Sequence, residues 1–69
     1  MTAKQIVDAG LGYAGMSGAQ LAAKLGWSPQ SLNNRMKTGK FSVDEWEQIA
    51  KAIGADLKLG FKFPDGREI

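Results

Sequence analysis

A short stretch of this sequence places amide, hydroxyl and ammonium groups on one face of a predicted helix, at Gln30, Ser31, Asn34 and Lys37. Asparagine and glutamine amides pair bidentately with adenine in the major groove, serine bonds to several bases, and lysine reaches guanine or phosphate. Gln30 and Asn34 are one helical turn apart, so their side chains are neighbours. This pattern predicts hydrogen bonds to adjacent base pairs of duplex DNA.

The other side of the same predicted helix is apolar, because Pro29, Leu32 and Met36 fall together at 100° per residue, with Asn33 and Arg35 flanking the polar face. Exposed helix faces usually carry Glu, Lys or Arg, which are better helix formers than asparagine. An amide-rich face therefore favours recognition over its alternative interpretation, a neutral solvated surface.

Nothing in the composition supports catalysis or metal binding. The chain has no cysteine and no histidine, so the usual zinc ligands and the commonest general base are missing. Gly10, Gly12 and Gly15 match the spacing of a dinucleotide-binding loop, but no strand pattern precedes them. We expect no enzyme activity, no cofactor and no metal.

Three serines position the predicted helices between residues 17 and 54. Ser17 with Gln20, and Ser42 with Glu45, have the spacing of a capping box, in which each partner satisfies a free backbone N–H. Ser28 precedes Pro29, which is well tolerated at a first helical position. A glycine closes each helix, at Gly26, Gly39 and Gly54.

The two ends of the chain have different periodicities. Residues 2–14 carry an apolar stripe of helical spacing. After Gly54 the period changes to two, because Leu57, Leu59, Phe61 and Phe63 alternate with polar residues and glycine. The sequence predicts a mainly α domain of four short helices followed by a β-strand or hairpin, with a turn at 64–66.

The size and charge of the chain set further limits. With 69 residues it forms one domain, residues 1–69. A net charge of +2 is compatible with nucleic acid but equally ordinary for proteins that bind no polyanion. No apolar stretch approaches the roughly 20 residues of a membrane span, so we expect a soluble cytoplasmic protein without a membrane partner.

Residues 20–35, QLAAKLGWSPQSLNNR, resemble the two-helix unit of the phage-repressor and Cro type helix-turn-helix family, also called lambda-repressor-like or XRE. The small Ala22, the turn glycine Gly26 and the buried aliphatic Leu32 are in register with that unit. The resemblance implies base contacts by outward residues early in the second helix, namely Gln30, Ser31, Asn33 and Asn34. It also implies phosphate contacts at the helix starts and the following loop, through Ser17, Gln20, Ser28, Lys37, Thr38 and Lys40.

Many members of this family continue with a fifth helix, whereas this chain continues with the alternating segment. An unpaired apolar strand is an aggregation hazard, and some Cro-like repressors and antitoxins pair C-terminal strands across a twofold axis. We therefore expect a homodimer through Leu57, Leu59, Phe61 and Phe63, reading a palindromic operator as a transcriptional repressor. The alternatives are a protein-interaction module with the same fold and an antitoxin-like subunit that also binds a toxin.

Overall fold

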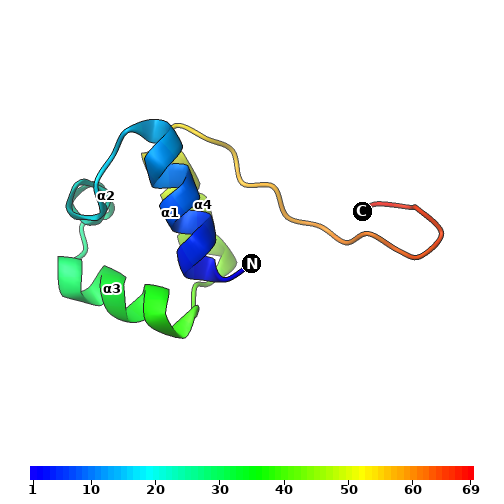
Figure 1. Ribbon diagram of the computed structural model, residues 1–69, viewed down its shortest axis with the longest axis horizontal. Helices are drawn as coiled ribbons and strands as arrows, with labels where there is room; N and C mark the ends of the chain where they lie inside the picture. Colours follow the sequence, from blue (N-terminus) through cyan, green and yellow to red (C-terminus); the bar gives the residue numbers. More distant parts are fainter.

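The computed structural model describes all 69 residues and contains four helices and no β-sheet (Figure 1). The helices are α1 (Ala3–Ala14), α2 (Gly18–Leu25), α3 (Pro29–Thr38) and α4 (Val43–Ala52). The prediction of a mainly helical chain with four short helices is confirmed. None of these helices combines the length and the apolarity that crossing a membrane requires.

Local capping explains where the helices begin. Thr2, Ser17 and Ser42 each accept a hydrogen bond from the backbone N–H three residues later, and the Gln or Glu at that position accepts one from the cap backbone in return. Ser28 accepts from the Ser31 N–H at 3.1 Å and is followed by Pro29. These caps satisfy backbone donors that would otherwise have no intrahelical partner.

Left-handed glycines end the first three helices. Gly15, Gly26 and Gly39 have φ values of 66°, 74° and 69°, a conformation that other residues adopt at a steric cost. Gly26 allows α3 to begin shortly after α2 ends, so the two helices are joined by a sharp turn. The predicted helix–turn–helix sequence therefore folds locally as two helices joined by a short turn.

A single apolar core holds the helices together. Its fully buried members are Leu21 of α2 and Leu32 of α3, and it also contains Val7, Leu11, Ala22, Met36 and Ile49. α2 packs against both α3 and α4, and α1 packs against α3. Gly10 of α1 lies close to Ile53, because a Cβ at Gly10 would come within 2.9 Å of the Ile53 Cδ1. The core fixes α3 from its apolar side.

The predicted strand over residues 57–63 is not formed. This segment leaves the helical body as an open chain and folds back at its end, which gives the molecule a long dimension of 42 Å (Figure 1). A single antiparallel bridge joins Lys62 and Glu68. A strand needs a backbone partner along its length, and the returning residues 67–69 reach only residues 61–63.

The predicted turn at 64–66 is confirmed. Gly66 has a φ of 90°, its N–H donates to the Phe63 carbonyl at 3.0 Å, and the Asp65 carboxylate accepts from the Arg67 N–H at 2.9 Å. Proline, aspartate and glycine are suited to such reversals for separate reasons of φ preference and side-chain hydrogen bonding. The C-terminal segment is thus a narrow hairpin tip on an otherwise unpaired chain.

Candidate nucleic-acid interface

The outer face of α3 carries the amide groups that the sequence singled out. Gln30, Asn33 and Asn34 are all exposed, whereas Leu32 and Met36 of the same helix lie in the core. The short helix therefore has its apolar side fixed and its amide side open to solvent. Amide groups free of intramolecular partners can accept and donate to the edge of a base.

Ser31 is less accessible than the other predicted base-contacting residues. It is half-buried, and its backbone N–H is used by the Ser28 hydroxyl. Ser28 itself is exposed and uses only an acceptor lone pair in this bond. Its O–H is left to donate to a group outside the protein.

The N-terminus of α2 presents hydrogen-bond donors. In its capping box the Ser17 hydroxyl accepts from the Gln20 N–H at 3.1 Å, and the Gln20 Oε1 accepts from the Ser17 N–H at 2.8 Å. Both acceptors are thereby used, which leaves the Ser17 O–H and the Gln20 NH₂ as free donors. Donors at a helix N-terminus, where the helix dipole is positive, are suited to an anion such as phosphate.

The predicted phosphate contacts after α3 differ among themselves. Lys37 and Lys40 are exposed and form no ion pair within the chain. Thr38 is also exposed, but its hydroxyl donates to the Asn34 and Arg35 carbonyls at 3.2 and 3.3 Å. Because a phosphate oxygen can only accept, Thr38 would first have to release these carbonyls. The two lysines are the better phosphate ligands in this loop.

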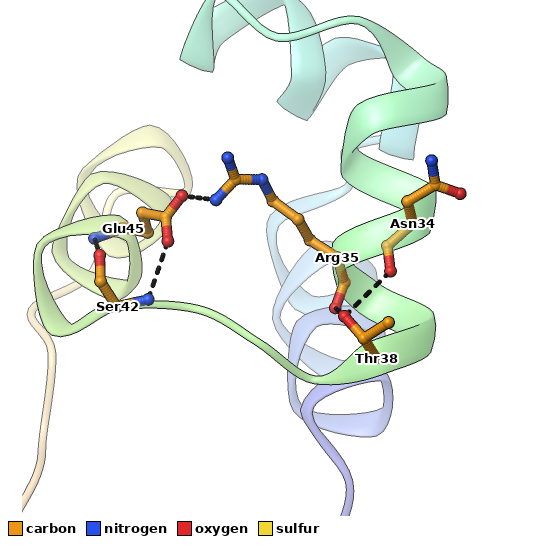
Figure 2. A network of polar contacts seen from close by, with 5 residues as sticks. All are labelled: Asn34, Arg35, Thr38, Ser42 and Glu45. Carbon is orange, nitrogen blue, oxygen red and sulfur yellow. Dashed lines mark hydrogen bonds and ion pairs between the residues drawn. The ribbon is translucent and has the colours of Figure 1, made fainter.

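Arg35 is turned away from the amide face. Figure 2 shows its side chain extending toward α4, while the Asn34 amide points away from that helix. The guanidinium forms an ion pair with Glu45 Oε2, and Glu45 Oε1 accepts from the Ser42 N–H at 2.8 Å. One carboxylate therefore caps α4 and binds α3 at the same time.

An aromatic cluster lies beside this ion pair. The Arg35 guanidinium carbon is 4.6 Å from the Trp27 ring centroid, a distance typical of a cation–π contact. Trp27 stacks on Phe41 with centroids 6.4 Å apart, and Phe41 packs against Trp46 at 4.8 Å. The turn before α3 and the loop after it are therefore joined through side chains. The sequence predicts for Arg35 only a position at the flank of the polar face, and no residue spacing indicates its contacts with Trp27 and Glu45.

The predicted dimer-interface residues lie on the C-terminal segment. Leu57 is half-buried against the helices, whereas Leu59 and Phe61 are 72% and 74% exposed and Phe63 is 44% exposed. Leu57 lines a groove of about 200 Å³ whose other walls include Ile6, Trp46 and Ile53. The apolar side chains beyond Leu57 thus have little cover within the chain.

Comparisons with models of protein families, with curated proteins and with solved structures find no match for this chain. The exposed amides of α3, the free donors at the starts of α2 and α3 and the two unpaired lysines are groups able to bind bases or phosphates. No group of three His, Cys, Asp or Glu side chains is close enough to hold a metal ion.

Proposed function

We propose that this protein is a sequence-specific DNA-binding transcriptional regulator of the lambda-repressor-like helix-turn-helix type. In this proposal α2 and α3 are the helix-turn-helix unit, and α3 lies in the major groove. The observation that carries it is the exposed amide face of α3, formed by Gln30, Asn33 and Asn34, opposite a side anchored by Leu32 and Met36. A helix fixed on one side and chemically able to read bases on the other is suited to this role.

Affinity and discrimination come from different residues in this mechanism. Ser17, Gln20, Ser28, Lys37 and Lys40 would bind phosphates and set the register on the duplex, with a strong dependence on salt. Gln30 and Asn34 would bind bases, with Asn33 and the less accessible Ser31 beside them. Occlusion of a promoter by the bound protein would repress transcription. The proposal implies the cytoplasm as the site of action.

The protein would bind as a homodimer joined through Leu57, Leu59, Phe61 and Phe63. A twofold dimer would present two α3 helices to half-sites one turn of DNA apart, so the operator would be palindromic. The exposure of Leu59 and Phe61 in the single chain supports this part of the proposal. Large apolar side chains that are exposed near one another mark interaction surfaces.

Selection from a randomised duplex pool by gel shift tests the proposal. We expect enrichment of one palindrome, and loss of about 1 to 3 kcal/mol of discrimination at defined base pairs for Gln30→Ala or Asn34→Ala. Gln48→Ala is the matched control, because Gln48 is an exposed amide on α4. Absence of any enriched sequence would refute the proposal.

The second candidate function is a protein-interaction module that adds its C-terminal segment to the sheet of another protein. The unpaired backbone of residues 57–60 favours it, since an open edge accepts a further strand. An antitoxin-like subunit would combine this interaction with DNA binding. Co-purification of a tagged chain with the products of neighbouring genes, followed by gel shift of the complex, separates these possibilities from a simple DNA-binding dimer.

A further inference from the structure

The backbone of residues 60–63 forms hydrogen bonds along one edge, toward residues 67–69, and its other edge is open. Phe61 exchanges hydrogen bonds with Ile69 at 2.8 and 2.9 Å, and the Phe63 N–H donates to the Arg67 carbonyl at 2.8 Å. Successive residues of an extended chain direct their N–H and C=O groups to opposite edges. Across a trans peptide the C=O of one residue and the N–H of the next point in opposite directions. The Gly60 carbonyl and the Lys62 N–H and carbonyl therefore point to the outer edge, where the chain supplies no backbone partner.

The side chains along this segment alternate in the same way. Apolar groups occupy the odd positions 57–63, and the even positions carry Asp56, Lys58, Gly60 and Lys62. A two-stranded hairpin is marginally stable in water, and an open edge beside an apolar face is a template for a further strand. The charges of Asp56, Lys58 and Lys62 indicate which partner strand this edge would accept.

We infer that the open edge pairs with the same edge of a second copy, antiparallel, with Leu59 on the twofold axis. This inference deepens the dimer of the proposed function by giving its register. Asp56 then lies opposite Lys62 of the second copy, and by symmetry the ion pair occurs twice. Lys58 lies opposite Gly60, where no cation opposes it. Opposite charges at facing positions stabilise a strand pair.

Neighbouring registers are less favourable. With the axis on Gly60, Lys58 faces Lys62 of the second copy twice, and like charges at facing positions are destabilising. With the axis on Phe61, Lys58 faces Pro64, which has no N–H to donate. Of these three registers, the one on Leu59 avoids both costs and pairs Asp56 with Lys62.

The same register continues the apolar surface of the helical body. Leu57 lies opposite Phe61 of the second copy, and Leu57 lines the groove formed with Ile6, Trp46 and Ile53. The exposed Phe61 ring of each copy is therefore brought to the mouth of the other copy's groove. This contact gives cover to a side chain that is 74% exposed in the single chain.

Gly60 is required for the local geometry of this edge. A Cβ at Gly60 would overlap the Ile69 carbonyl oxygen, so no side chain fits there. The carbonyl that holds the Phe61 N–H could not keep its position beside a larger residue. Gly60 thus allows Ile69 to approach and bond Phe61.

Oxidative cross-linking without DNA tests the register, because the chain has no cysteine of its own. Leu59→Cys would place two thiols at a non-hydrogen-bonded pair on the axis, where Cα atoms lie about 4.5 Å apart, within the range of a disulfide. Phe61→Cys is the matched control, since Phe61 is equally exposed but off the axis. We expect at least tenfold more cross-linked dimer for Leu59→Cys.

Equal or greater cross-linking of Phe61→Cys would overturn the register, and a monomer by sedimentation at tens of micromolar would overturn the dimer.

A charge exchange gives a second readout. We expect Asp56→Lys to weaken dimerisation about tenfold and Lys62→Asp in the same chain to restore it, since two facing pairs change sign. Failure of restoration also contradicts the register. None of these measurements uses DNA, so a negative result would not contradict DNA binding. Equally, failure to select a DNA sequence would not contradict the register of the dimer.

Discussion

Arg35 and Glu45 form an ion pair between α3 and α4, and the second carboxylate oxygen of Glu45 accepts from the Ser42 N–H at 2.8 Å. The pair lies on the side of α3 away from the Asn34 amide (Figure 2). Core packing holds α3 through Leu32 and Met36. The ion pair and the Trp27 contact hold the same helix through Arg35, and together these contacts fix its rotation about its own axis. In the proposed complex, Arg35 would thus act as a positioning residue for the amide face.

Replacing Arg35 and Glu45 singly and together measures the strength of this pair. Because the side chains are 39% and 20% exposed, we expect a coupling of about 0.5 to 1 kcal/mol in urea unfolding of Arg35→Met and Glu45→Gln. Glu45→Gln retains an acceptor for the Ser42 cap. The exposed pair Lys4–Asp8, treated identically, should couple less, at about 0.3 kcal/mol. Equal coupling in both cycles would contradict the structural role.

Arg35→Met also separates positioning from direct contact with DNA. A lost phosphate contact lowers the slope of log affinity against log salt by about 0.9, whereas a lost positioning contact leaves that slope unchanged. We expect weaker operator binding with an unchanged slope, measured by fluorescence anisotropy over a salt series. A reduced slope would show that Arg35 binds the DNA backbone.

The lysines after α3 should behave in the opposite way. Lys37→Gln and Lys40→Gln should each weaken binding to all sequences alike, because each removes a cation proposed to displace a counterion. At about 0.9 per phosphate contact, and with each lysine present twice in the proposed dimer, the salt slope should fall by about 1.8. Lys51→Gln is the control, since Lys51 lies in the last turn of α4 and is exposed. An unchanged slope for both loop variants would remove the lysines from the interface.

The helices could be predicted from the sequence because their signals are local. Ser17 with Gln20, and Ser28 with Pro29, specify a helix start within four residues, and Gly26 specifies an end. The exposure of Gln30 and Asn34 follows from the same helical period that buries Leu32. The outer face of α3 was therefore predictable once the helix was.

The remaining features depend on partners that periodicity does not identify. Glu45 was recognised as a capping residue, but its second oxygen binds Arg35 on another helix, and no spacing rule links the two. The alternation from Leu57 to Phe63 predicts a strand that is not formed, because within one chain residues 57–60 have no backbone partner. The ion pair depends on a tertiary neighbour, and a strand at residues 57–60 would depend on an intermolecular one.

Ser17 combines a structural and a proposed binding role, which two substitutions separate. Ser17→Ala removes the acceptor for the Gln20 N–H and should cost about 1 kcal/mol of unfolding free energy. Ser17→Asp keeps an acceptor and adds a negative charge that favours the helix N-terminus, so stability should be retained. We expect its DNA affinity to fall below that of Ser17→Ala, because aspartate repels phosphate. Equal affinities, compared at a temperature where both variants are folded, would place Ser17 away from the DNA.

Two glycines of α1 should respond differently to alanine, although both lie inside the helix. A Cβ at Gly12 meets no atom within 4 Å, so Gly12→Ala should raise stability by up to about 1 kcal/mol through helix propensity. A Cβ at Gly10 comes within 2.9 Å of the Ile53 Cδ1, so the same gain is offset by displacement of that side chain. Thermal unfolding should therefore rank Gly12→Ala above wild type and Gly10→Ala below Gly12→Ala. Adding Ile53→Val to Gly10→Ala should recover part of the difference in melting temperature from Gly12→Ala, because removing the Cδ1 methyl relieves the close approach. No recovery would mean that α1 and Ile53 do not approach as described.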